Sequence, residues 1–328
     1  MFEKQPEVKQ PFELLPIFRE RIWGRTSLAP YFNSSPDKEP IGEVWFTFKD
    51  NPTSLGKPLG EVLAAYPEVL GSAVHDNFPG VCPLLVKLIF TTDRLSVQVH
   101  PDDEYAREHH DSLGKTEAWY VMDAPPSGEV AIGFKEPITP GRFQESIHSG
   151  EIEELLEWRK VQKGDIVFTP AGTVHAIGAG LTVCEIQENS DITYRLYDYG
   201  RPRELHLEHG MKVSRLEPHD CAPESVAIAP WRDSLLHCDY FRIERLRPQA
   251  PINITPSADF YLVLICLKGE GTLAGSSFAA GRAWFVPAGS ASFSIDGSGS
   301  EWILSYTAEH ILPGVAISTP KEETAALI

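Results

Sequence analysis

The chain has 328 residues, of which 42% are hydrophobic, and this is enough for two domains or one large β domain. Its net charge of −17 argues against nucleic acid and anionic membranes as partners, because both attract basic surfaces. No apolar run is long enough to span a bilayer or to serve as a signal peptide, so we expect a soluble, cytoplasmic protein. The cysteines are scattered, odd in number and without a CxxC pair, so a disulfide framework or a thiolate zinc site is not expected and a reducing compartment is favoured. They are Cys82, Cys184, Cys221, Cys238 and Cys266.

Short strand-like runs dominate the chain, and turn residues separate them at short intervals, which is typical of β-sandwiches and β-barrels. The 27 prolines and 25 glycines suit such a turn-rich protein. The predicted strands cover residues 43–48, 83–90, 95–100, 117–122, 129–134, 165–170, 181–187, 192–197, 241–246, 261–267, 282–287 and 302–307.

Three segments are predicted to be helical and one to be a linker. The first helix lies near 58–69, and the second begins with Pro101 at its first helical position. The third covers 143–159, whose glutamates we interpret as a solvated helix face rather than a functional acidic patch. Residues 217–230 are proline-rich and unpatterned, which predicts a linker.

The stretch LSVQVHPDD, residues 95–103, carries a polar strand face of functional interest. Side chains alternate between the two faces of a strand, so Ser96, Gln98 and His100 share one face while aliphatic residues occupy the other. The polar face has two interpretations, an ordinary solvated surface or two ligands of one metal ion, Gln98 and His100. Taken alone, the stretch favours the solvated surface.

An internal repeat is the most informative feature of the sequence. GDIVFTPAG, from Gly164, and GRAWFVPAG, from Gly281, share the pattern G-x-x-x-F-x-P-A-G with identical spacing. Each copy predicts a strand that runs into a tight turn and a new strand that leaves it. After the turn the first copy has His175 where the second has Ser292. Because one copy keeps the turn without the imidazole, we interpret His175 as functional rather than as a packing residue.

Strand–turn–strand units with a histidine after the turn resemble cupin barrels. The resemblance implies a mainly β fold of two cupin (jelly-roll) barrels with a few short helices. In the first copy, Gln98 and His100 precede GKTEAWYVM, in which Lys115 and Glu117 share a strand face. With His175 they supply two imidazoles, a carboxylate and an amide oxygen, a set that suits Zn²⁺ and also Mn²⁺, Fe²⁺ or Co²⁺. Positions left open for water or substrate are typical of a catalytic site.

Four motif blocks in order resemble type I phosphomannose isomerases, also called mannose-6-phosphate isomerases, of the short bacterial branch. The blocks are LSVQVHPDDEYA, GKTEAWYV, GDIVFTPAGTVHAI and QENSDITYRLYDYGR. Less chain separates Glu117 from His175 than in the longer members, which carry a helical insertion there. The resemblance implies a metal-dependent aldose–ketose isomerase that interconverts mannose 6-phosphate and fructose 6-phosphate through a cis-enediol.

The same resemblance implies a role for each candidate residue. The metal ligands that it implies are Gln98, His100, Glu117 and His175, of which the glutamine is the least uniform ligand in the family. Ser96 and Lys115 match positions near the sugar phosphate. Arg195 matches the arginine that faces the reacting carbons, and Asp191 matches an acid proposed to help with ring opening.

Two departures from the longer members bear on the mechanism. Gly114-Lys115-Thr116-Glu117 stands where many of them have His-Lys-Pro-Glu, and Ile177 stands where many have tyrosine. A histidine-mediated ring opening and a tyrosine hydroxyl are therefore not expected here. The proton-transfer base stays open between a metal-bound hydroxide, a carboxylate and Lys115. Arg195 is permanently charged and suits an oxyanion or a phosphate better than the role of a base.

The repeat and the motifs predict two domains. Residues 1–225 would form the metal-bearing catalytic cupin domain, with an N-terminal extension and short helices. Residues 226–328 would form a degenerate cupin domain without metal ligands and with a structural role. The expected partner is a small-molecule sugar phosphate held by Lys115 and Arg195, and we expect a monomer or a weak homodimer.

For each candidate residue, a purely structural role is the alternative to the functional one. His100 and His175 could be satisfied structural imidazoles, and Glu117 a solvated acid at a strand end. Lys115 could be a solvated loop charge. Lys87 interrupts the apolar run LLVKLIF and could either point into the pocket or extend along an edge to solvent.

Arg195 could form a structural salt bridge to Asp191 or Asp198, and Asp191 could be an N-cap or turn residue. The other histidines without a partner pattern are interpreted as surface residues: His109, His110, His206, His209 and His219.

Two other function classes fit the same residues. One is a different metal-dependent cupin enzyme, such as an Fe²⁺ oxygenase, whose usual H-x-H pattern is Q-x-H in this chain. The other is a non-catalytic phosphosugar-binding cupin, against which Lys115 and Arg195 argue because they accompany a full ligand set.

Overall fold

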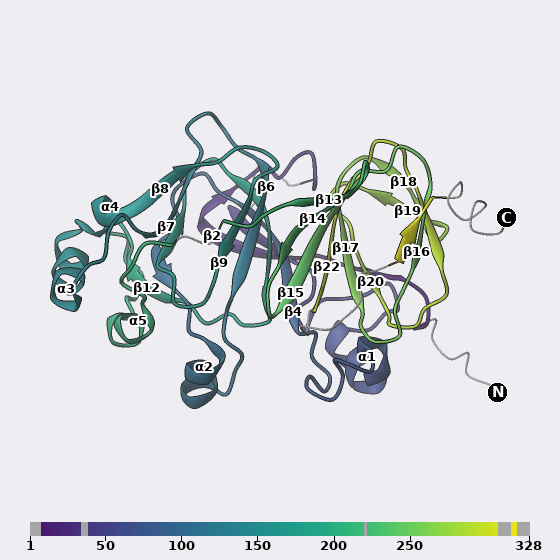
Figure 1. Cartoon of the computed structure of the whole chain (residues 1–328), viewed down its shortest axis with the longest axis horizontal. Coiled ribbons are helices and arrows are strands. Elements are labelled where there is room, and N and C mark those ends of the chain that lie inside the picture. The colour runs from purple at the N-terminus through teal and green to yellow at the C-terminus, as the bar shows by residue number, and fades with distance from the viewer. Residues whose placement is uncertain (1–7, 34–38, 220–221, 308–315, 320–328) are drawn as a thin grey trace.

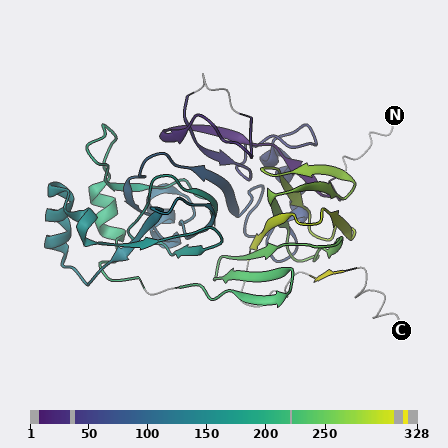
Figure 2. The same cartoon turned by 90° about the horizontal axis from the view of Figure 1, so that it is seen from above.

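The structure is a computed structural model that describes residues 8–33, 39–219, 222–307 and 316–319 (Figure 1). Two β-rich halves lie side by side along the long axis, and the short helices lie at their edges (Figures 1 and 2). The expected mainly β fold with a few short helices is confirmed, and every predicted strand is present with ends that differ by a few residues. Cys221 and the stretches 308–315 and 320–328 of the predicted second domain lie outside the described residues.

The N-terminal half contains a six-stranded and a five-stranded sheet. The first has the order β2-β3-β4-β11-β6-β9 and the second the order β12-β5-β10-β7-β8. Central strands such as β4 and β11 are buried along their whole length. This explains the nearly continuous apolar sequence of β4, whereas β11 also carries buried Glu185, Gln187 and Glu188. The strands are β2 Ile17–Arg25, β3 Ile41–Trp45, β4 Leu84–Phe90, β5 Val97–Val99, β6 Glu117–Asp123, β7 Glu129–Phe134, β8 Leu156–Lys160, β9 Ile166–Thr169, β10 His175–Ile177, β11 Thr182–Glu188 and β12 Tyr194–Tyr197.

The C-terminal half contains a seven-stranded sheet of order β1-β20-β17-β22-β15-β14-β13 and a five-stranded sheet of order β19-β18-β21-β16-β23. Its edge strand β1 comes from the other end of the chain and pairs Phe12 with Phe285. The strands are β1 Phe12–Leu14, β13 Val226–Ala229, β14 Arg232–His237, β15 Phe241–Leu246, β16 Ile252–Thr255, β17 Leu262–Lys268, β18 Glu270–Leu273, β19 Ser276–Ala279, β20 Ala283–Val286, β21 Phe293–Asp296, β22 Glu301–Thr307 and β23 Ala316–Ser318.

The four sheets are open within the described ranges, because each has two different edge strands. The closed barrels expected from the cupin resemblance are therefore not confirmed, whereas the mainly β architecture is. The predicted linker 217–230 is partly wrong, because its last residues form β13.

The helices are short and depart from the predictions at their ends. They are α1 Leu59–Ala65, η1 Pro67–Leu70, α2 Asp103–His110, α3 Pro140–Ser149, α4 Ile152–Leu155 and α5 Leu207–Val213. The prediction that α2 begins at Pro101 is wrong: its first helical residue is Asp103, and Asp102 is the N-cap, whose side chain accepts a hydrogen bond from the Tyr105 amide. The single helix predicted over 143–159 is wrong: Gly150, with φ of 83°, ends α3, and the segment finishes as β8.

The internal repeat is visible in the backbone. Gly172 and Gly289 both have positive φ, 84° and 65°, which suits the tight turn that each copy makes. The amide of the next residue closes both turns, from Thr173 to the Pro170 carbonyl and from Ser290 to the Pro287 carbonyl. The two copies therefore share one local structure and differ in the residue that follows the turn.

One buried apolar cluster extends through both halves and includes residues of β4, β17 and β20. Phe285 stacks with Phe12 at 5.2 Å and with Tyr261 at 5.1 Å between ring centroids. Burial of each such side chain stabilises the fold by about 1.5–3 kcal/mol, so this shared cluster holds the halves together. Among the described residues, no helix has the length and apolar character needed to cross a membrane.

Candidate active site

Three buried side chains from two sheets meet inside the N-terminal half. His100 follows β5, His175 opens β10, and Glu117 opens β6 of the facing sheet. Each can offer an atom within 4.8 Å of the others, and the two imidazole centroids are 4.8 Å apart. All three side chains are buried. The structure thus brings together three residues that are distant in the sequence, and we call them the triad.

Backbone carbonyls orient both imidazoles of the triad. His100 Nδ1 donates to the Ile192 carbonyl and His175 Nδ1 to the Thr173 carbonyl, each at 2.8 Å. The Nε2 atoms therefore face Glu117, at 3.4 Å from Oε2 and 3.3 Å from Oε1. Burial lowers the pKa of both imidazoles, that of His100 well below its usual value, so both stay neutral. A neutral imidazole fixed through Nδ1 is the form that binds a metal through Nε2.

Glu117 supplies the negative charge of the triad. Burial alone would raise its pKa, but the neighbouring charges, chiefly Lys115, hold the pKa of this carboxyl below its usual value. Within the described residues neither carboxylate oxygen has a hydrogen-bond partner, although both are buried. The ammonium group of Lys115, 3.2 Å from Oε2, is a cation beside it but leaves the buried carboxylate short of the donors that an ionised group requires. The triad therefore fits a divalent metal ion, and Glu117 is not the solvated strand-end acid considered above.

Gln98 and Ser96 lie next to the triad on the polar face expected from the sequence. The β5–β10 register sets Gln98 opposite His175, with Gln98 Nε2 at 3.3 Å from His175 Nε2. The amide oxygen of Gln98, which is its only possible metal ligand, accepts a hydrogen bond from Ser96 Oγ at 3.2 Å. Gln98 is therefore at the site, but its amide nitrogen faces the triad.

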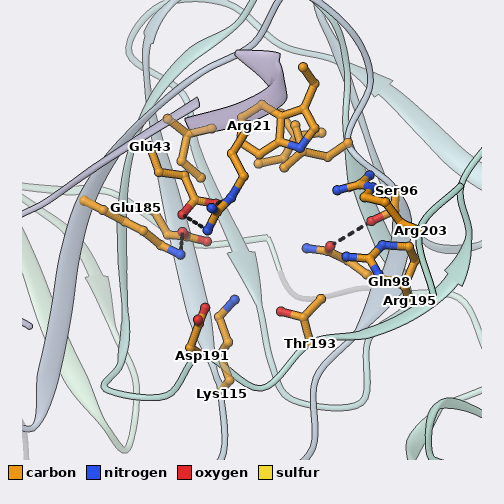
Figure 3. A pocket seen from close by; sticks show the side chains of 15 residues that line it. Arg21, Glu43, Ser96, Gln98, Lys115, Glu185, Asp191, Thr193, Arg195 and Arg203 are labelled. Carbon is orange, nitrogen blue, oxygen red and sulfur yellow. Dashed lines mark hydrogen bonds and ion pairs between the residues drawn. The ribbon is translucent and has the colours of Figure 1, made fainter. Parts of the chain in front are cut away.

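A cavity of about 390 Å³ opens beside the triad and is mostly lined by polar side chains (Figure 3). Ser96, Gln98, Lys115, Asp191 and Arg195 all line it. In Figure 3, the side chains of Glu43 and Glu185 lie on one side of the cavity, and those of Arg195 and Arg203 lie on the opposite side. The cavity thus presents cationic groups to any ligand that reaches the triad.

Lys115 points inward at the triad. Its Nζ lies 3.2 Å from Glu117 Oε2 and 3.1 Å from His100 Nε2, and the side chain is 3% exposed. The alternative of a solvated loop charge is therefore wrong. This position sets the ammonium group of Lys115 between the triad and the open cavity.

Arg195 lies in β12, where the register sets it opposite Gln98. Its Nη1 donates to the Glu204 carbonyl at 2.7 Å, whereas its buried Nε has no hydrogen-bond partner in the described parts of the chain. Burial lowers the pKa of Arg195, which still leaves the guanidinium charged. A buried donor without a partner is a place where a ligand oxygen can bind.

The salt bridge considered for Arg195 is not formed. Asp198 pairs instead with Arg201 at 2.8 Å and with Arg203 at 2.6 Å. Asp191 is exposed at the cavity wall, and no ion pair joins it to Arg195 in the described part of the chain. The guanidinium of Arg195 thus keeps its capacity for an anion.

A buried ionic network forms the opposite wall, and the sequence reasoning identified only one of its members. Lys87 of β4 lies opposite Glu185 of β11, and Lys87 Nζ is 2.8 Å from Glu185 Oε2. Trp119 Nε1 donates to Glu185 Oε1 at 3.1 Å, and Arg21 pairs with Glu43 at 3.0 Å. The available signal for Lys87 was a charged residue inside an apolar run, whereas Glu185 lies among other polar residues of β11 and gave no such signal. Lys87 lines the cavity and is not an edge residue that reaches solvent.

The histidines interpreted as surface residues divide into three groups by exposure. His109 and His110 are exposed and His206 and His209 are half-buried. His219 is buried, with Nε2 at 2.9 Å from the Phe168 carbonyl, so its surface assignment is wrong. The segment around Pro218 packs on Gly133 of β7, which covers this imidazole.

The fold and the site define a class of protein: a mainly β protein with an open His/Glu centre suited to a divalent metal and an adjoining cationic cavity. Residues 12–140 match the family model described as phosphomannose isomerase type I, catalytic domain. The probable mannose-6-phosphate isomerase GmuF of Bacillus subtilis is 34% identical over 322 residues, covering 90% of this chain and 99% of that protein. The mannose-6-phosphate isomerase ManA of the same organism is 34% identical over 311 residues, covering 88% and 96%. The chain belongs to the type I mannose-6-phosphate isomerase family.

Solved structures agree with this assignment. The mannose 6-phosphate isomerase from Bacillus subtilis superposes with a TM-score of 0.81 and 30% identity, covering 90% of this chain and 99% of that chain. A phosphomannose isomerase mutant from Salmonella typhimurium superposes with a TM-score of 0.77 at 16% identity, a likeness of fold alone.

Proposed function

We propose that this protein is a metal-dependent isomerase that interconverts mannose 6-phosphate and fructose 6-phosphate. The observation that carries the proposal is the buried triad, whose carboxylate has no hydrogen-bond partner among the described residues and adjoins a cavity with lysine and arginine side chains. The relatives at 34% identity over most of both chains bear the corresponding names. Neither an oxygenase nor a purely sugar-binding role has a specific observation in its favour.

His100, Glu117 and His175 would hold the metal, with Gln98 as a fourth ligand once its amide oxygen turns toward the triad. Zn²⁺ is the ion that we expect first for this N/O set, with Mn²⁺, Fe²⁺ and Co²⁺ as alternatives. When bound by these residues, such an ion would supply Lewis-acid polarisation and a positive charge opposite developing negative charge.

The protein's own charges would bind and orient the sugar phosphate. The unpaired Nε of Arg195 suits an oxygen of the substrate, and the guanidinium fork matches phosphate geometry. Ser96 would donate a hydrogen bond from the same wall once it releases Gln98. Lys115 would hold a positive charge beside the reacting carbons, since its ammonium group adjoins the triad.

Proton transfer between two adjacent carbons requires a group that can hold the proton within the cavity. Lys115 and the carboxylate of Glu185 are both buried at the cavity wall, which supports either as the carrier. Asp191 is exposed, which supports proton exchange with solvent during ring opening.

The finer architecture belongs to the same proposal. We propose that 1–225 and 226–328 correspond to two cupin units, the second without metal ligands, with β1 as an exchanged edge strand. A cytoplasmic location and a monomeric or weakly dimeric state stay predictions.

The experiment is a turnover assay with purified protein stripped of metal and reloaded with Zn²⁺, Mn²⁺, Fe²⁺ or Co²⁺. We expect mannose 6-phosphate to form from fructose 6-phosphate with at least one ion, and activity to disappear with a chelator. Absence of turnover with all four ions in a protein that binds them would contradict the proposal. Oxygen consumption by the iron form would instead favour an oxygenase.

A further inference from the structure

A second polar cavity lies in the C-terminal half, away from the triad. It has a volume of about 370 Å³ and is lined by side chains of β13, β14, β15 and β22. The strand registers set Ser234 opposite Glu244, His237 opposite Arg242, and Arg242 opposite Tyr306. Because directly opposed residues point to the same side of a sheet, these side chains form one continuous patch.

This patch lies on the side of the seven-stranded sheet that faces the five-stranded sheet. Trp302 and Tyr306 lie on the same face of β22. The Trp302 ring contacts the Phe278 ring of β19, with 4.6 Å between the two ring centroids. The opposite face turns to the N-terminal half, where Arg245 Nη1 lies 3.4 Å from the Tyr120 hydroxyl. The cavity therefore opens into the C-terminal unit and is separate from the triad pocket.

The charges of the patch do not balance. Arg232 forms a buried bidentate pair with Glu244, at 2.7 and 3.1 Å, and the Tyr306 hydroxyl donates to Glu244 at 2.9 Å. Glu244 is thus fully engaged, and Arg242 has no carboxylate partner within the described residues. The other four arginines of 222–307 each pair with a carboxylate: Arg232, Arg245, Arg247 and Arg282.

Arg242 also carries a buried Nε that has no hydrogen-bond partner among the residues that the structure describes. Leaving a buried donor unsatisfied costs about 1–3 kcal/mol, and a guanidinium fork satisfies itself best on an oxyanion. The same feature marks Arg195 in the triad pocket. Arg19 shares it as well, but its guanidinium lies over the Trp45 ring at 4.6 Å. Arg242 instead interacts with the Tyr306 hydroxyl, which itself donates to Glu244, so its Nε is left for a further acceptor.

We propose that this second cavity binds a small anion bearing a phosphate group, with Arg242 as the principal contact and Ser234 and His237 at its sides. Donors from two strands surround the position, which suits a tetrahedral oxyanion. The inference does not depend on the reaction proposed for the triad pocket.

The test is calorimetric titration of the metal-loaded, full-length protein with inorganic phosphate, with fructose 6-phosphate and with fructose. We expect Arg242→Gln to bind one equivalent of phosphate fewer than the wild type, or to weaken that equivalent by about 10–100-fold. Comparing the affinity for inorganic phosphate with the affinity for fructose 6-phosphate shows whether the site prefers free phosphate or a phosphate ester. Fructose alone should leave this site empty.

Arg247→Gln is the matched control, because this exposed arginine already pairs with Asp233 at 2.9 Å and should bind as the wild type does. Ser234→Ala is the milder second variant, read out by the same titration if Arg242→Gln does not fold by circular dichroism. The proposal is overturned if the variants that fold keep wild-type stoichiometry and affinity, or if acetate competes as well as phosphate for the site.

Discussion

The buried pair of Lys87 and Glu185 allows a quantitative test of the cavity wall. Lys87 Nζ lies 2.8 Å from Glu185 Oε2, and the two side chains are 4% and 3% exposed. At an effective dielectric constant of about 20, this separation corresponds to roughly 6 kcal/mol of attraction before the cost of desolvation. The charge of Lys87 also lowers the pKa of Glu43 and of Glu117. Lys87 therefore offsets several buried carboxylates at once.

We expect Lys87→Met to destabilise the fold by about 3–5 kcal/mol near neutral pH, because it leaves a buried carboxylate without its partner. The loss should be smaller at pH 5.5 than at pH 7.5, since a stranded carboxylate can take up a proton. Lys87→Met/Glu185→Leu should recover part of the loss, because it removes both charges. The measurement is urea unfolding of the metal-free protein at both pH values.

Lys160 provides the matched control. It pairs with Glu129 at 3.1 Å but is 65% exposed, so Lys160→Met should cost less than about 1 kcal/mol. The reasoning is refuted if Lys87→Met also stays within about 1 kcal/mol of the wild type, or if the double variant is less stable than the single one.

Three further outcomes are expected. His175→Ser, which copies the second repeat, should abolish metal binding and turnover while the circular dichroism spectrum is unchanged; a fully active variant would remove His175 from the site. Arg195→Gln should lower kcat/KM by about 100-fold or more with an intact fold, because a charge-assisted contact to the substrate is lost, and unchanged kinetics would exclude that contact. Burial and the nearby Asp103 raise the pKa of Glu188 from 4.5 to about 8. The protonated form of Glu188 therefore stabilises the fold, fully below pH 4.5, and this contribution is lost as the pH rises through 8. Glu188→Gln should therefore be more stable than the wild type at pH 9, by at most about 5 kcal/mol in urea unfolding, and an equal pH slope for both proteins would contradict this.

Most of the fold that could be predicted from the sequence was predicted from the periodicity of the strands and from the internal repeat. A long apolar strand such as β4 was identifiable because nearly every position is apolar and buried. The short strands β18 and β19 were missed because their polar, mostly exposed residues give no such pattern. Residues 156–159 were predicted as helix because glutamate and leucine favour helices, but they belong to β8, and their pairing with β7 outweighs the local preference.

The site was predictable only where residues share a strand or a motif. Gln98 and His100 were found by alternation, and His175 by comparison with Ser292 of the second copy. Glu185 was missed because its partner Lys87 lies far away in the sequence, and only the β4–β11 register brings them together. Long-range pairing of this kind is not encoded in any local pattern.

The central claim is that His100, Glu117 and His175 hold one divalent cation, and anomalous X-ray diffraction from crystals of the zinc-loaded protein tests it most directly. We expect one strong peak about 2.0–2.2 Å from both Nε2 atoms and from a carboxylate oxygen of Glu117. A peak at another position only, or none in protein shown by elemental analysis to contain zinc, would contradict the account.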